Sequence, residues 1–288
     1  MDMVSIGKYN DLKITRTLDF GVIVEGEPFG EILVPRKYVE PGWKVGDTVS
    51  VFVYTDSEDR LVATTEQPLI QAGGFATLRV RQMTPVGAFL DCGLAKDLLV
   101  PYREQYHRLQ VGERVVAYAY VDEKSQRMVA TTKVEPHLFA APADAYRPKD
   151  RVKIIVYQQT DMGYKVIVDQ RYKGMVYADE VFSGLRYGDR AEAYVEQIRP
   201  DGKIDLVMYK TGYAKVVDFS DTLIERIRSN GGSLPYTDRS DPETIYRVFG
   251  VSKKTFKKAV GDLYRKRMVE LREEGLFLTN DQKTLNNK

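Results

Sequence analysis

The sequence contains little cysteine and little histidine. One cysteine, Cys92, excludes an internal disulfide framework and leaves too few thiols for a zinc finger. The two histidines, His107 and His137, lie far apart in the pattern described below, which argues against a shared acid–base or metal site. No glycine-rich phosphate loop of P-loop spacing occurs. We therefore expect no catalytic residue, no metal and no cofactor, and hence a protein that is not an enzyme.

Long apolar runs and an excess of one charge are also missing. Lys and Arg number 43 against 41 Asp and Glu, a net charge of +2. No segment approaches the roughly 20 apolar residues of a membrane span, and the first residues lack the basic and apolar regions of a signal peptide. We therefore expect a cytoplasmic protein with no membrane partner. Aromatic residues are abundant instead, with 19 Tyr and 11 Phe.

Three copies of one sequence pattern occupy the first two thirds of the chain. With an offset of 66 residues, Gly21 aligns with Gly87, and Leu33-Val34-Pro35 aligns with Leu99-Val100-Pro101. With a further offset of 76 residues, Gly87 aligns with Gly163. Apolar residues alternate within each copy, as they do along half-buried strands. A unit of about 65 residues with five short strands has the size of a small closed barrel.

The copies resemble the RNA-binding domain named after the largest small-subunit ribosomal protein, here called the S-one domain. The resemblance rests on Phe-Gly or Gly-x-Phe after the first strand, a Leu-Val-x segment, a Gly-Asp-x-Val turn and a final Leu-x-Ala-Thr strand. In that family, aromatic residues around the glycine, a residue of the third strand and a basic residue before the last strand contact nucleic acid. The resemblance therefore implies RNA-binding roles for Phe20, Phe89, Tyr177, Arg60, Arg127 and Lys203.

The aromatic positions of the family pattern are incompletely filled. Ile23, Val86 and Met162 stand where the pattern has aromatic residues, so each copy is expected to bind weakly alone. Tandem copies still bind usefully through their high effective concentration. An alternative interpretation is that Phe20 and Phe89 fill barrel interiors.

After Lys210 the apolar period changes from 2 toward 3.6, which indicates helices. The first helix ends at Gly231-Gly232, and the second opens with a capping box from Ser240 to Glu243. Ser252 caps a third helix that runs to about Met268. Residues 269–271 and 276–278 then form a hairpin. Three helices and a hairpin in this order are typical of a winged-helix domain.

The third helix is strongly basic. Residues 251–268 include seven Lys or Arg and one acidic residue, Asp262. Helical spacing places Lys254, Lys258 and Arg265 in one stripe, with Lys257 beside it, opposite an apolar face of Phe256, Val260 and Leu263. Gly261 lies on the stripe and leaves room for close approach of a ligand. Because this helix occupies the recognition position of a helix-turn-helix, we expect these cations to contact phosphates, although a basic face can also be merely solvated.

The expected fold is mainly β with an α+β tail: three tandem five-stranded OB-fold barrels followed by a winged helix. We place the barrels at residues 1–66, 67–135 and 150–212, a linker at 136–149 and the winged helix at 213–288. This domain order resembles the conserved virulence factor B family of bacterial RNA-binding regulators. The resemblance implies a cytoplasmic, non-catalytic protein that binds RNA and regulates gene expression, including virulence, after transcription.

Single-stranded RNA is the expected partner, because its bases are free to stack. Two alternatives stay open. One is a DNA-binding transcription regulator that uses the winged helix, with the barrels as effector modules. The other is an interaction scaffold on the ribosome or the RNA-decay machinery, which the incomplete aromatic pattern keeps open.

Overall fold

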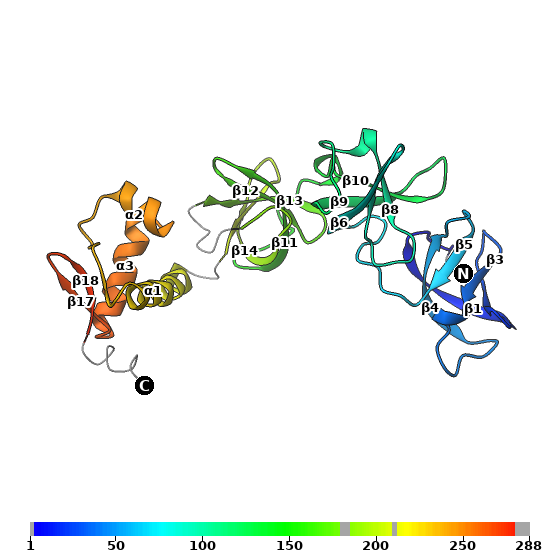
Figure 1. The fold of residues 1–288 in the computed structure, drawn as a ribbon, viewed down its shortest axis with the longest axis horizontal. Coiled ribbons are helices and arrows are strands. Elements are labelled where there is room, and N and C mark those ends of the chain that lie inside the picture. Colours follow the sequence, from blue (N-terminus) through cyan, green and yellow to red (C-terminus); the bar gives the residue numbers. More distant parts are fainter. Residues whose placement is uncertain (1–2, 179–184, 209–211, 280–288) are drawn as a thin grey trace. The chain divides into compact units, whose positions relative to one another are not determined.

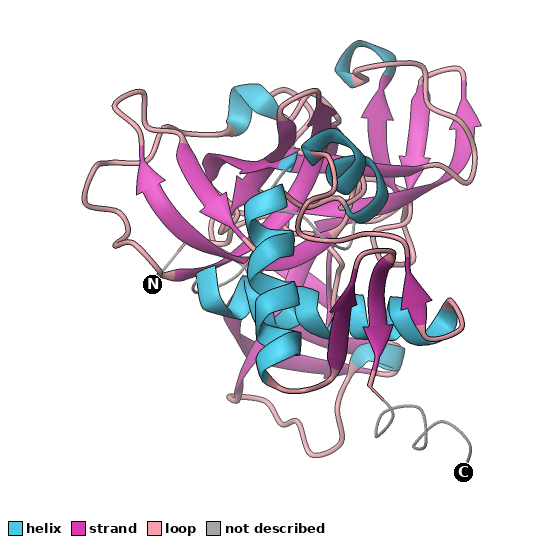
Figure 2. Cartoon of the chain, turned by 90° about the vertical axis from the view of Figure 1, so that its left-hand side faces the viewer, coloured by secondary structure: helices cyan, strands magenta, loops and turns pink. Residues whose placement is uncertain are grey.

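The computed structural model describes residues 3–178, 185–208 and 212–279. Two compact units make up the chain, Met1–Leu138 and Phe139–Lys288. Strands dominate up to residue 207, and the long helices follow them along the chain. Figure 2 shows the strands in magenta and the helices in cyan. None of the helices within the described residues is both long enough and apolar enough to cross a membrane.

The first barrel belongs to the first unit and closes on itself in the order β1-β2-β3-β5-β4. Its core consists of alternate residues of these strands, among them Ile14, Val24, Ile32, Val34 and Val51, all inaccessible to solvent. The strands are β1 (Lys8–Leu18), β2 (Gly21–Glu25), β3 (Glu31–Pro35), β4 (Thr48–Thr55) and β5 (Leu61–Thr64), with a 3-10 turn at Arg36–Tyr38 after β3.

The second barrel repeats this arrangement. Its hydrogen-bonded order is β10-β9-β6-β7-β8, and the two strands at the ends of that order lie next to each other. Phe52, Tyr54 and Val62 of the first barrel share a hydrophobic core with the second, which explains why the two barrels form one compact unit. The elements are β6 (Phe75–Thr84), β7 (Gly87–Leu90), β8 (Leu98–Pro101), β9 (Arg114–Val121) and β10 (Met128–Thr131), with 3-10 turns at Tyr102–Glu104 and Glu135–His137.

The second unit begins with the third barrel, which closes in the order β11-β12-β13-β15-β14. Part of the expected linker packs on it: Ala141 lies in the barrel core, and the Phe139 amide donates a 3.0 Å hydrogen bond to the Arg171 carbonyl. The strands are β11 (Arg151–Thr160), β12 (Gly163–Val168), β13 (Tyr172–Tyr177), β14 (Arg190–Ile198) and β15 (Ile204–Val207). The exact domain boundaries stay a prediction.

The C-terminal elements form a separate hydrophobic core in the second unit. Phe219, Leu223 and Ile227 of α1 pack with apolar residues of α2 and α3 and of a three-stranded sheet ordered β16-β18-β17. The elements are α1 (Gly212–Ser229), β16 (Ser233–Leu234), α2 (Pro242–Phe249), α3 (Lys253–Arg265), β17 (Val269–Arg272) and β18 (Gly275–Leu278) (Figure 1). Three barrels followed by this helical and stranded region confirm the expected fold class.

Three details of the C-terminal elements differ from expectation. The α2 cap is Asp241, whose carboxylate accepts a 2.9 Å hydrogen bond from the Thr244 amide, whereas the Ser240 hydroxyl accepts one from the Thr237 amide. Helix α3 ends at Arg265 rather than near Met268, because the chain takes a positive φ at Arg267. Strand β16 was not predicted, since two residues are too short to show a period.

Each barrel has a glycine at the same position, where the second strand begins after the turn from the first strand. At the start of the second strand, an added Cβ would lie 2.2 to 2.3 Å from a carbonyl oxygen of the third strand, which no side chain tolerates. The three pairs are Gly21 with Val34, Gly87 with Val100 and Gly163 with Val176. In each barrel the residue before this glycine lies in the turn between the first two strands and is exposed, a position that we call the barrel rim.

Candidate nucleic-acid interface

The residue before the repeated glycine of each copy is an exposed apolar side chain. Phe20 is 61% exposed, Val86 is 60% exposed and Met162 is 67% exposed. Phe20 therefore does not fill a barrel interior, and its ring is available to a ligand. The partner positions two residues after the glycine are less accessible: Ile23 is buried and Phe89 is half-buried. The predicted stacking role thus has better support at Phe20 than at Phe89.

The predicted basic loop residues of the first two barrels are engaged within the protein. Arg60 forms ion pairs of 2.7 Å with Asp56 and 2.9 Å with Glu58. Burial alone would raise the pKa of Asp56, but hydrogen bonds from the Arg60 side chain and from neighbouring amides outweigh it and lower that pKa. An acidic partner reduces the net charge that Arg60 offers to a phosphate.

Arg127 connects the two barrels of the first unit. Its guanidinium pairs with Asp59 in the β4–β5 loop of the first barrel. Lys96 of the second barrel lies 3.7 Å from the same carboxylate and donates a 2.5 Å hydrogen bond to the Asp56 carbonyl. The sequence pattern did not reveal this cluster, because its members come from different repeats.

The third barrel carries a polar cluster instead of an exposed aromatic residue. Tyr177, opposite Gly163 in the ladder, is half-buried, and its hydroxyl accepts a hydrogen bond from Arg199. The Arg199 guanidinium lies 5.7 Å from the centre of the Tyr177 ring, and its Nε donates a 2.8 Å bond to buried Asp205. Nearby Lys203 is exposed but lies 2.9 Å from Asp201. Arg199 is a candidate contact residue that the sequence pattern missed. Asp205 stands in the parallel ladder where the first barrel has a valine, and this acidic residue is the sequence signal that could have pointed to Arg199.

Helix α3 has the two faces that the sequence predicts. Phe256, Val260 and Leu263 are buried in the core, whereas the basic stripe of Lys254, Lys258 and Arg265 is exposed together with Lys257. Lys257 and Arg265 have only long ion pairs, of 3.9 Å to Asp238 and 3.8 Å to Asp262. Within the described part of the chain, no ion pair involves Lys254 or Lys258. These two lysines therefore keep their full charge for an external anion.

Residues with nucleophilic or metal-binding chemistry have structural surroundings. Cys92 is buried, its thiol donates to the Lys96 carbonyl, and burial raises its pKa, which lowers the thiolate fraction. His107 contacts Glu113 at 2.6 Å, and His137 stacks on Tyr118 with ring centres 4.1 Å apart. Across residues 3–178, 185–208 and 212–279, no group of three or more His, Cys, Asp or Glu is placed to hold a metal ion.

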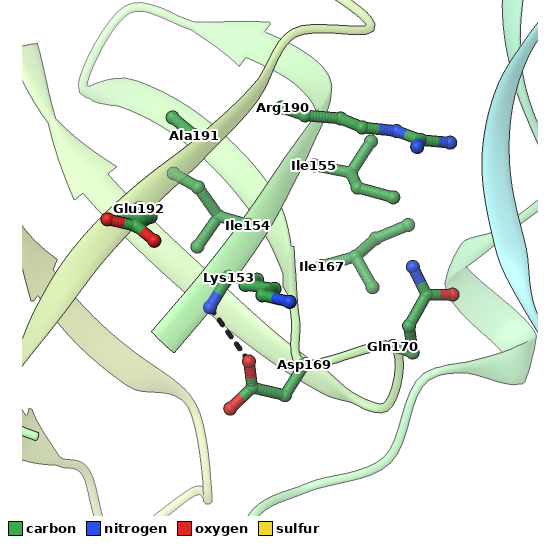
Figure 3. A pocket seen from close by; sticks show the side chains of 9 residues that line it. All are labelled: Lys153, Ile154, Ile155, Ile167, Asp169, Gln170, Arg190, Ala191 and Glu192. Carbon is green, nitrogen blue, oxygen red and sulfur yellow. Dashed lines mark hydrogen bonds between the residues drawn. The ribbon is translucent and has the colours of Figure 1, made fainter. Parts of the chain in front are cut away.

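A pocket on the third barrel is lined by none of the predicted contact residues (Figure 3). Its volume is about 520 Å³, and the apolar part of its lining consists of Ile154, Ile155, Ile167 and Ala191. Lys153, Asp169, Arg190 and Glu192 surround them with charges of both signs. Mixed charge gives no preference for an anionic ligand, so the pocket is not part of the candidate interface.

Family comparisons agree with this arrangement. A family described as S1 domain matches residues 6–66 and 72–133, the regions of the first two barrels, and a CvfB-like winged helix domain matches residues 221–278. The chain belongs to the CvfB-like family. It is 25% identical over 248 residues to Conserved virulence factor B of Staphylococcus epidermidis, covering 83% of both chains.

Other relatives of this CvfB-like chain include a protein of Bacillus subtilis named YitL and described as uncharacterized. The two are 27% identical over 274 residues, which cover 92% of this chain and 90% of that one. A crystal structure of a multidomain protein with nucleic acid binding domains from Streptococcus pneumoniae aligns over 95% of this chain and 98% of that chain, with a TM-score of 0.45 and 23% identity.

Proposed function

We propose that this protein is a non-catalytic RNA-binding protein of the bacterial cytoplasm that regulates gene expression, including virulence, after transcription. The observation that carries the proposal is the exposed basic face of α3, where Lys254 and Lys258 have no acidic partner among the described residues. Such cations attract the phosphate backbone without reading sequence. The relatives named Conserved virulence factor B support the link to virulence.

Single-stranded RNA suits the barrel rims better than a duplex does. Phe20 offers an exposed ring, and one base stacked on an aromatic ring contributes about 1 to 3 kcal/mol, so a rim with one ring binds weakly by itself. Bases inside a duplex are already stacked on each other and are not free to stack on a side chain. Tandem barrels and a basic helix on one chain raise the overall affinity through effective concentration.

A competition experiment tests the proposal. The full-length protein is bound to labelled single-stranded RNA at fixed salt, and unlabelled single-stranded RNA, single-stranded DNA and duplex DNA of equal length compete. We expect single-stranded RNA to compete best. Preference for the duplex would instead support the DNA-binding regulator, and absence of binding to all three would support the interaction scaffold.

A further inference from the structure

On the exposed face of α3, the missing side chain of Gly261 leaves open space, which we call the Gly261 notch. On a helix surface, the neighbours of a residue are those three and four positions away. For Gly261 these neighbours are Lys257, Lys258, Tyr264 and Arg265, and all four are exposed. A residue without a side chain is thus surrounded by three cations and one aromatic ring. Figure 1 shows α3 in orange beside the β17–β18 hairpin.

Packing does not explain why position 261 is glycine. A Cβ built there would meet nothing within 4 Å, and the position lies in the interior of α3, where alanine is the better helix former. By contrast, a Cβ at Gly275 of the same domain would collide with the Leu234 carbonyl oxygen at 2.0 Å. The fold requires glycine at 275 but not at 261, so the empty space at 261 is available to something outside the chain.

The exposed aromatic ring of Tyr264 lies next to the Gly261 notch on the surface of α3. Its side chain is 56% exposed, and within the described part of the chain it takes part in no side-chain hydrogen bond or ring contact. Tyr236 of the same domain behaves differently, since its ring packs edge-on against Phe249 with centres 5.1 Å apart. An aromatic ring exposed between cations is the arrangement that single-stranded nucleic acid recognition uses: stacking for the base and charge for the backbone.

We propose that the Gly261 notch binds one nucleotide of single-stranded RNA, with the base stacked on Tyr264 and an adjacent phosphate held by Lys257, Lys258 and Arg265. The missing side chain at 261 lets the flat base reach the helix surface. This assignment rests on the proposed function and goes further, because it makes α3 a reader of unpaired bases rather than a helix that only attracts phosphates. A duplex hides the base faces and offers the notch only its backbone.

The test separates base stacking from charge. Two probes of about 12 nucleotides, within the site size of an OB-fold barrel, are a labelled single-stranded RNA and the same ribose-phosphate chain without bases. Affinities are measured by fluorescence anisotropy for the wild-type protein and for Tyr264→Ala, Tyr264→Phe and Gly261→Gln. Tyr246→Ala is the matched control, because Tyr246 is an exposed tyrosine of the same domain on α2.

We expect Tyr264→Ala to weaken binding of the RNA by about five-fold or more and to leave binding of the baseless chain unchanged. Tyr264→Phe should retain the wild-type affinity, and Gly261→Gln should weaken RNA binding because its side chain fills the notch. The control variant should match wild type on both probes.

Two results would overturn the assignment. One is an RNA affinity of Tyr264→Ala that equals the wild-type affinity, while the triple alanine variant of Lys254, Lys258 and Arg265 binds RNA more weakly. This result would exclude base stacking on Tyr264 and would leave the proposed function intact. The other is an equal loss on both probes, which would show that Tyr264 does not contact a base. Failure of the wild-type protein to bind either probe would overturn the proposed function itself.

Discussion

Replacement of glycine by alanine should change the free energy of unfolding in opposite directions at Gly261 and Gly87. The Gly261→Ala variant should raise the free energy of unfolding by about 1 kcal/mol, because alanine is the better helix former and its Cβ meets nothing within 4 Å. Urea denaturation of the full chain, followed by helix-sensitive circular dichroism, measures the change. A loss of stability in Gly261→Ala would show that the fold does require glycine there.

The Gly87→Ala variant is the matched comparison. Its Cβ would lie 2.3 Å from the Val100 carbonyl oxygen, at a φ of +151° that side chains rarely adopt. We expect it to destabilise the second barrel by more than about 1 kcal/mol, since backbone strain adds to the steric overlap. The pair of variants separates a glycine that the fold needs from one that it does not.

Phe20 should contribute to binding and not to stability. Because its ring is mostly exposed, Phe20→Ala should leave the free energy of unfolding nearly unchanged while it weakens binding of single-stranded RNA by about five-fold or more. Phe52, which is fully buried, is the control: Phe52→Ala should lower the free energy of unfolding by about 3 to 5 kcal/mol. Equal affinity of Phe20→Ala and wild type would remove Phe20 from the interface.

At the scale of an element, we expect the charge of α3 to determine the salt dependence of RNA binding. Each phosphate contact to a single strand contributes about −0.7 to the slope of log K against log salt, so replacing Lys254, Lys258 and Arg265 by alanine should flatten that slope by about 2. Binding titrations at several salt concentrations measure it. Arg151→Ala is the control, because Arg151 is paired with Glu192 on the third barrel. An unchanged slope in the triple variant would contradict the role of the stripe.

We expect His137, in the 3-10 turn at Glu135–His137, to make the first unit sensitive to acid. Burial against Tyr118 lowers the pKa of His137 below its ordinary value of 6.5, so the folded chain binds fewer protons than the unfolded chain as the pH falls through 6.5. The contribution of neutral His137 to the free energy of unfolding is therefore fully present above pH 6.5. It is lost as the pH falls from 6.5 toward the lowered pKa that His137 has in the folded chain. Urea denaturation at about pH 7.5 and about pH 5.5 should show a smaller loss in His137→Phe, which keeps the ring stack, than in wild type. An equal loss would assign the acid sensitivity to other groups.

At the scale of the whole molecule, the ion pair between Arg127 and Asp59 helps to hold the first two barrels together. Both side chains are about half exposed, so Arg127→Ala and Asp59→Ala should each lower the free energy of unfolding by at most about 1 kcal/mol. Because the two residues act as a pair, the double variant should lose less than the sum of the single losses. Normal stability with weaker RNA binding in Arg127→Ala would instead support the contact role that the sequence predicts.

Regular patterns were readable from the sequence, and contacts between distant residues were not. The repeated glycines and alternating apolar residues predicted three barrels, and the spacing in α3 predicted which face would be buried. The pairing of Arg127 with Asp59 joins residues 68 positions apart in different repeats, so no periodicity marks it. Tyr264 went unnoticed because helical spacing emphasised the lysines around it. The cap of α2 moved from Ser240 to Asp241 because neighbouring residues of equal capping ability compete.

The contact between each glycine and the facing carbonyl is made by backbone atoms alone. The contact therefore does not depend on which side chains surround it. The rim residue is Phe20 in the first barrel and Val86 in the second. In the third barrel it is Met162, beside the cluster of Tyr177 and Arg199. Duplication of such a barrel yields copies whose rims can diverge separately without loss of the fold. The same barrel fold can thus carry different side chains at each of its three rims.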